Sequence, residues 1–190
     1  MVRKRRVWLP NHFYHIVSRG NRKEVLFQDD KDYRVFFYIL EEVFESHPFE
    51  ISSYCLLSNH YHLQLRSKHV PVSKIMALIN KRYATYFNLR YELTGHVFEK
   101  RYFGEILETN GDMLEVSRYI HLNPVKAGIC IRPEDYRWSS YRYYYNSYRA
   151  IPYLKTSVLL EGYPGTVREK RAEYRNYVNV LRKDLLNPTL

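Results

Sequence analysis

The stretch Tyr54–Arg66 reads YCLLSNHYHLQLR, and it decides the fold. Apolar and polar residues alternate on both sides of Ser58 and Asn59, a pattern typical of two strands joined by a tight turn. The second strand begins at His60 and carries His62 two residues later. Residues i and i+2 on a strand project to the same face, so the two imidazoles are expected side by side. The pair is either a metal site or two packing histidines, because imidazole is a common metal ligand.

The rest of the chain supplies the partners of this hairpin. Alternating or helical spacing of apolar residues predicts further strands at 12–19, 49–57 and 101–108, and helices at about 30–47, 72–94, from 110 onwards and about 167–186. The order β-α-β-β-α-β-α predicts an α+β fold, a ferredoxin-like or RRM-like antiparallel sheet with helices on one face. The hairpin is expected at the middle of this sheet and the His pair on a central strand. Residues 1–150 are expected to form one domain, and residues 151–190 a helical extension packed on or beside it.

The distribution of charge indicates a polyanionic partner. The chain carries a net charge of +10, and residues 1–23, 51–91 and 136–160 contain Lys and Arg but no acid. The His pair lies in one of these acid-free zones, which suits a phosphate backbone. A membrane surface is the competing interpretation, but there is no apolar run of spanning length, no signal-peptide core and no lipid-anchor motif. We therefore expect a cytoplasmic protein, with Cys55 and Cys130 as free thiols.

A second group of polar residues lies on the helix that begins at residue 110. Tyr119 and Asn123 are four residues apart and share one helix face. A phenol can act as a covalent nucleophile, and an amide oxygen can be a third ligand to a metal held by the His pair. Asn123 can instead cap a short helix that starts at Pro124. The spacing alone does not select Tyr119 over Tyr83 or Tyr86, because the chain contains twenty tyrosines.

Several ordered blocks of the sequence resemble a known family. His60-Tyr61-His62 resembles the HUH motif, and residues 58–63 resemble its Pro-Asn-His-x-His-Leu setting, with Ser58 where Pro is usual. Further blocks that resemble single-tyrosine transposases are residues 13–21, 95–98, 101–102, 119–128 and 138–141. Together they make the chain, over about residues 10–145, similar to the REP-associated tyrosine transposases, which are relatives of insertion-sequence transposases.

This resemblance implies a specific chemistry. Members of the family cut single-stranded DNA beside hairpins formed by palindromic repeats, with Mg²⁺ or Mn²⁺ as cofactor, and join the 5′-phosphate to a tyrosine. By position, His60 and His62 become metal ligands and Tyr119 the nucleophile, with Asn123 as a candidate third ligand. The candidate DNA contacts are Arg19, Asn21, Arg82 and Arg101. The resemblance further implies a nucleoid-associated prokaryotic protein that acts as a monomer or homodimer.

Two other functions remain open from the sequence. A catalytically silent binder of single-stranded or hairpin nucleic acid would have the same basic zones and aromatic residues, but it would not need the His pair with Tyr119. An RNA-binding module on the same kind of sheet would use exposed aromatics such as Tyr61 and leave the histidines idle. A structural zinc site is disfavoured, since the two cysteines have no four-ligand spacing.

Overall fold

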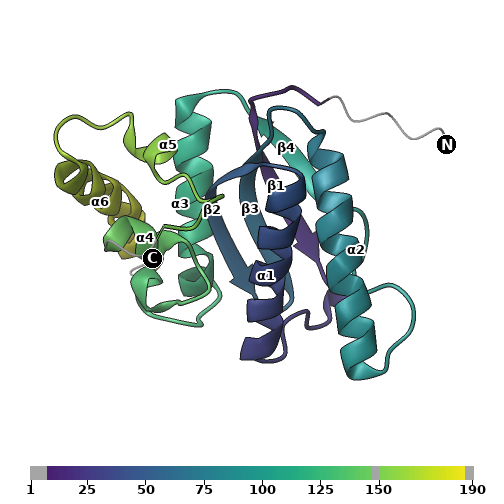
Figure 1. The fold of residues 1–190 in the computed structure, drawn as a ribbon. Helices are drawn as coiled ribbons and strands as arrows, with labels where there is room; N and C mark the ends of the chain where they lie inside the picture. Colours follow the sequence, from purple (N-terminus) through teal and green to yellow (C-terminus); the bar gives the residue numbers. More distant parts are fainter. Residues whose placement is uncertain (1–7, 147–149, 187–190) are drawn as a thin grey trace.

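The protein forms a four-stranded sheet with helices on both faces (Figure 1). The computed structural model describes residues 8–146 and 150–186, with the backbone alone for 181–186. In chain order the elements are β1 (Phe13–Arg19), η1 (Asn21–Lys23), α1 (Asp30–Ser46), β2 (Glu50–Leu57), β3 (His60–Arg66), α2 (Val72–Tyr91), β4 (Phe103–Leu107), α3 (Asn110–Lys126), η2 (Pro133–Asp135), α4 (Tyr141–Tyr145), α5 (Ser157–Leu160) and α6 (Val167–Leu186).

The sheet has the topology expected of a ferredoxin-like fold. Its strand order is β2-β3-β1-β4, and every neighbouring pair is antiparallel. The prediction of an antiparallel α+β sheet with a C-terminal helical extension is therefore confirmed. One detail of it was wrong, because β2 is an edge strand and the β2–β3 hairpin fills one half of the sheet. β1 inserts between β3 and β4, which leaves β3 as a central strand, as predicted.

Helices α1 and α2 lie side by side over one face of the sheet (Figure 1). Their apolar sides meet Ile16, Leu63 and Leu65 in the main core. The start of α1 follows from Asp29, whose side chain accepts hydrogen bonds from the backbone N–H groups of Lys31 and Asp32. These two helices are therefore the ones that fit the expectation of helices on a single face.

Helix α3 corrects that expectation, because it crosses the opposite face. Ile120 packs there in a buried cluster with Cys55 and Leu57 of β2. The side chain of Gln64 on β3 also donates a hydrogen bond to the backbone carbonyl of Met113 at 2.8 Å. Alternate residues of a strand point to opposite faces, so apolar residues on both faces of β2 require cover on both sides. The His pair consequently faces α3 rather than α1 and α2.

The C-terminal elements gather beside α3 (Figure 1). Tyr174 and Val178 of α6 are fully buried against this helix and its neighbours. Before α5, the chain runs along the free edge of β2, where Ile51 N–H donates to the Tyr153 carbonyl at 2.8 Å. Division into domains at residue 150 stays a prediction. Among the described residues, Cys55 and Cys130 are not joined in a disulfide, and none of the helices there has the length and apolar character that a membrane span requires.

Candidate active site

The two histidines of β3 stand together on the face covered by α3. Their ring centroids are 5.1 Å apart. Tyr61 between them points the other way, into the main core, where its ring packs on Phe36 at 4.7 Å. The strand alternation predicted from the sequence therefore places the pair correctly.

Hydrogen bonds hold each imidazole in the tautomer that a metal ligand needs. His60 Nδ1 lies 2.6 Å from Oδ1 of Asn59, which can only accept, so Nδ1 carries the proton. His62 Nδ1 lies 3.0 Å from His15 Nε2, and its Nε2 faces the amide nitrogen of Asn123 at 3.4 Å. Since Asn123 donates to Nε2, His62 donates from Nδ1 to His15. In both rings Nε2 is thus the nitrogen without a proton, as a metal ligand needs, although the His62 Nε2 accepts from Asn123 in this structure.

The histidines of this site are neutral at ordinary pH. Burial lowers the pKa of His15 to about 4. Burial, with help from the positive charge of Arg19, lowers the pKa of His60 to about 4. For His62 the pKa lies well below its usual value, because burial, the neighbouring His15 and His60, and Arg19 all disfavour a charged ring. A metal binds only the neutral form of imidazole, so these shifts favour binding.

Helix α3 brings Tyr119 to the His pair. The Tyr119 ring meets the His62 ring edge-on at 5.5 Å between centroids, and the His15 ring at 6.0 Å. Tyr119 is 41% exposed, so its hydroxyl is accessible to a substrate. The Lys126 ammonium lies 4.9 Å from the centre of the Tyr119 ring. This is a cation–π contact, and it places a positive charge beside the candidate nucleophile.

Asn123 lies one turn further along α3 and is only 8% exposed. The helix continues through Pro124 to Lys126, so the interpretation of Asn123 as the cap of a new helix was wrong. Pro124 has no N–H, so the helical bond to the carbonyl of Ile120 is not made, and α3 ends two residues later at Lys126. The amide of Asn123 therefore faces His62, and turning it over would direct Oδ1 to the His62 Nε2 side.

The donors available for a metal are two imidazoles and one amide. Among residues with described side chains, no group of three or more His, Cys, Asp or Glu has metal-binding geometry. Two Nε2 lone pairs and an amide oxygen are donors that suit a divalent ion, which can complete its coordination with water or substrate oxygens. The residues therefore fit a catalytic ion with open positions.

A cleft of about 420 Å³ opens beside Tyr119 and His62. Basic side chains reach it from two directions, Arg19 from the end of β1 and Lys100 and Arg101 from the loop before β4. Two of the predicted DNA contacts, Arg19 and Arg101, are thus brought to the same cleft as His62 and Tyr119. The cleft also contains two acids, Glu99 and Glu105.

The other two predicted DNA contacts lie outside this cleft. Arg82 of α2 pairs with Glu42 of α1 at 3.2 Å, on the opposite side of the sheet. Asn21 lies two residues after the end of β1, and its backbone N–H donates to the carbonyl of Val97 at 2.8 Å. Asn21 therefore fastens the end of β1 to the loop that carries Lys100 and Arg101.

Two residues of the site were missed as functional residues in the sequence. His15 lies diagonally across the β1–β3 pair from His62, and Asn59 is the turn residue before His60. His15 shares its face with Arg19, two strand repeats further on. Only the register in which β1 pairs with β3 brings His15 next to His62, and that register cannot be read from the sequence.

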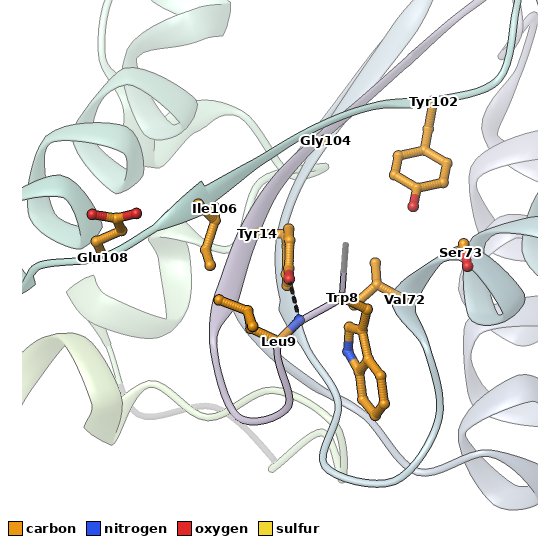
Figure 2. A pocket seen from close by; sticks show the side chains of 9 residues that line it. All are labelled: Trp8, Leu9, Tyr14, Val72, Ser73, Tyr102, Gly104, Ile106 and Glu108. Atoms are coloured by element: carbon orange, nitrogen blue, oxygen red, sulfur yellow. Dashed lines mark hydrogen bonds between the residues drawn. The ribbon is translucent and has the colours of Figure 1, made fainter. Parts of the chain in front are cut away.

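A second cavity lies on the other side of β4 (Figure 2). Its volume is about 310 Å³, and its walls include Trp8, Tyr14 and Tyr102. A side chain at Gly104 would collide with the Tyr102 ring, since its Cβ would lie 2.7 Å from that ring. Successive residues of β4 thus face different cavities, with Phe103 in the cleft and Gly104 in the apolar cavity.

A comparison with protein families identifies the relatives of this chain. A family model described as "Transposase IS200 like" matches residues 9–123, more than half of the chain. The chain belongs to the IS200-like transposase family. The matched range runs from just before β1 to Asn123, so it includes the His pair, Tyr119 and the three strands that line the cleft, β1, β3 and β4. No curated protein matches this IS200-like chain.

Two solved structures are similar to this chain to different degrees. One is a REP-associated tyrosine transposase bound to a REP hairpin, 20% identical, with a TM-score of 0.65 over 88% of this chain and 93% of the other. Another is a protein described as a transposase from Deinococcus radiodurans R1, 15% identical, with a TM-score of 0.42 over 63% of this chain and 95% of the other. The IS200-like chain therefore shares the fold of the REP-associated transposase over most of its length.

Proposed function

We propose that this IS200-like transposase is a metal-dependent endonuclease and strand transferase for single-stranded DNA, acting beside hairpins formed by palindromic repeats. The contact of the Tyr119 ring with the His62 ring, at 5.5 Å in a basic cleft, carries the proposal. A nucleophile beside candidate metal ligands is the arrangement that phosphoryl transfer requires. The hairpin bound by the REP-associated transposase of the same fold supports the substrate class.

His60 and His62 would hold Mg²⁺ or Mn²⁺ through their Nε2 atoms, with Asn123 as the third protein ligand. The bound ion would polarise the scissile phosphate and neutralise charge that develops on it. His15 and Asn59 act on the ligands, because each fixes the tautomer and the direction of one imidazole.

Tyr119 performs the bond exchange. Its phenolic oxygen attacks phosphorus, and the bond from phosphorus to the 3′ oxygen breaks. The departing oxygen takes a proton and becomes a free 3′-OH, while the 5′-phosphate stays on Tyr119. A 3′-OH can later attack this phosphotyrosine, which forms a new diester and returns the proton to the tyrosine. One diester replaces another in each step, so no ATP is needed.

Basic residues of the cleft position the DNA strand. Arg19, Lys100 and Arg101 line the cleft and would contact phosphates of the strand near the scissile bond. Lys126, above the Tyr119 ring, adds a further positive charge beside the nucleophile, where a phosphate strand would lie. Asn21 acts on the DNA strand only indirectly, because its backbone holds the loop that carries Lys100 and Arg101. Arg82 has no part in this arrangement, because its ion pair lies on the other face of the sheet.

The test is covalent capture of DNA. Single-stranded oligonucleotides that carry the palindromes flanking the gene are incubated with protein and Mn²⁺ and run on a denaturing gel. We expect a protein–DNA adduct from the wild type and no adduct from Tyr119→Phe, which lacks the nucleophilic oxygen but should bind the oligonucleotide with unchanged affinity. An equal yield from Tyr119→Phe would contradict the assignment of the nucleophile.

The same gel also tests the metal ligands and distinguishes the proposed nuclease from a catalytically silent binder. His60→Ala and His62→Ala should each abolish the Mn²⁺-dependent adduct, and retained cleavage would mean that the ion is held elsewhere. Tight binding by the wild type without any adduct would favour a catalytically silent binder of hairpin DNA. Arg82→Gln is the matched control, since it removes a basic residue remote from the cleft and should leave the adduct unchanged.

A further inference from the structure

The C-terminal helix α6 is fastened to α3 by one fully buried tyrosine. The Tyr174 hydroxyl lies 2.9 Å from the hydroxyl of Ser117 and 2.8 Å from Nδ1 of His121. Ser117 and His121 are one turn apart on α3, and the exposed fraction of all three side chains is 0%. Hydrogen bonds in such a dry environment are costly to break, because no water replaces the lost partner.

These hydrogen bonds continue from α3 to the sheet. His121 Nε2 lies 2.8 Å from the hydroxyl of Ser140, and this hydroxyl accepts the backbone N–H of Tyr54 on β2 at 2.8 Å. Both ring nitrogens of His121 therefore have a partner, which a neutral imidazole with one donor and one acceptor satisfies. A single buried chain of bonds joins α6, α3 and β2, and it fixes the rotation of α3 about its own axis.

The reactive residues of α3 lie on the side of the helix opposite to this network. Tyr119 stands midway between Ser117 and His121 in the sequence. Side chains two positions apart in a helix point in directions that differ by roughly 200° around the axis. Tyr119 and Asn123 thus project toward His62, while Ser117 and His121 project toward α6. Any rotation of α3 that breaks the bonds to Tyr174 also moves the Tyr119 oxygen relative to the His pair.

We propose that Tyr174 is a positioning residue that sets the approach of Tyr119 to the His60–His62 site, and that this is the task of the C-terminal extension. The inference rests on the proposed role of Tyr119 as nucleophile. Tyr174 touches no reacting atom and acts only through Ser117 and His121. A displacement of a reacting group by about 1 Å can lower a rate by roughly a hundredfold, so loss of this network should slow the reaction of Tyr119 strongly.

The first test compares two tyrosines of the same buried cluster. Tyr174→Phe keeps the ring but leaves His121 without one partner. We expect the rate of adduct formation at saturating oligonucleotide to fall about tenfold or more, with unchanged affinity for the oligonucleotide. Tyr144→Phe is the matched control, because its hydroxyl is equally buried but donates to the backbone carbonyl of Ser52 on β2. It should lose stability and keep its rate.

A double variant separates positioning from stability. His121→Leu combined with Tyr174→Phe removes both polar partners, so no buried group is left unsatisfied, and the melting temperature should recover relative to Tyr174→Phe alone. We expect the adduct rate to stay low, because the bonds that orient α3 are still absent. Recovery of the rate together with the melting temperature would overturn the proposal and leave Tyr174 as a folding residue only.

A second measurement requires no activity. Amide hydrogen exchange, followed by mass spectrometry, should become faster in peptides that contain residues 117–123 of Tyr174→Phe, and should stay unchanged there in Tyr144→Phe. Unchanged exchange in Tyr174→Phe would overturn the proposal even if the wild type forms adducts. If the wild type forms no adduct, the proposed function fails, while faster exchange would still show that Tyr174 holds α3.

Discussion

At the scale of single residues, the site depends on histidines that stay uncharged. His62 is within hydrogen-bonding distance of His15 and in ring contact with His60, and burial is the main cause that lowers the pKa of all three. Three neighbouring imidazoles could not all carry a proton without strong repulsion. The close packing of this cluster therefore favours metal binding, but it should make the folded protein less stable at acidic pH.

The lowered pKa values of these histidines predict how the stability of the protein depends on pH. The pKa of His15 and of His60 is about 4 in the folded protein and about 6.5 when unfolded. Between these values the unfolded chain binds more protons, so stability should fall as the pH drops from about 6.5 to about 4. Melting temperature measured against pH checks this. His15→Gln keeps an acceptor for His62 but does not titrate, so its loss of stability should be smaller. If the melting temperature of His15→Gln fell with pH as steeply as that of the wild type, His15 would not be a source of the acid sensitivity.

At the scale of elements, α1 and α2 are joined by a buried carboxylate. Asp32 is fully buried and accepts from the hydroxyls of Tyr86 and Tyr91, both at 2.8 Å, and from Arg90 at 2.6 Å. The Gln28 backbone N–H is a further donor at 2.7 Å. These four donors satisfy the carboxylate where water cannot, and they set the spacing of the two helices.

Removal of this carboxylate should destabilise the fold. Asp32→Ala leaves Arg90 and two phenols with fewer partners, and we expect a loss of about 3 kcal/mol in the free energy of unfolding, measured in urea. Glu42→Gln is the control, since it breaks the exposed pair between α1 and Arg82 of α2 and should cost less than about 1 kcal/mol. Similar losses from the two variants would contradict a special role for the buried pair.

At the scale of the whole molecule, each chain holds a complete candidate site. Tyr119 faces His62 of the same chain, and α3 is fastened both to α6 and to the sheet. An exchange of Tyr119 between two copies would require these bonds to break. The structure therefore favours a tyrosine that acts on its own His pair.

Mixing two inactive variants tests this arrangement. Tyr119→Phe retains the metal ligands, and His62→Ala retains the nucleophile. If the site works within one chain, their mixture should form no adduct, as measured on a denaturing gel with chains of different tagged length. An adduct on the His62→Ala chain would show that the tyrosine serves the His pair of another copy.

Much of the site could be predicted from the sequence because its signals are local. Alternation placed His60 and His62 on one face of a strand, and helical spacing put Tyr119 and Asn123 on one face of α3. The ends of α6 were also predicted, Val167 to Leu186. Each of these features depends on residues only a few positions apart, whose period or capping a single segment contains.

The sequence by itself determined the four strands, the long helices α1, α2, α3 and α6, their order and the residues of the HUH-like pair, but not the short helices between α3 and α6. Only the tertiary structure decided that α3 covers the face opposite to α1 and α2, that His15 meets His62, and that Arg82 is remote from the cleft. It also joined Tyr174 to His121. These facts depend on strand register and on the packing of distant segments, which follow from the burial of many side chains at once. No local pattern contains that information.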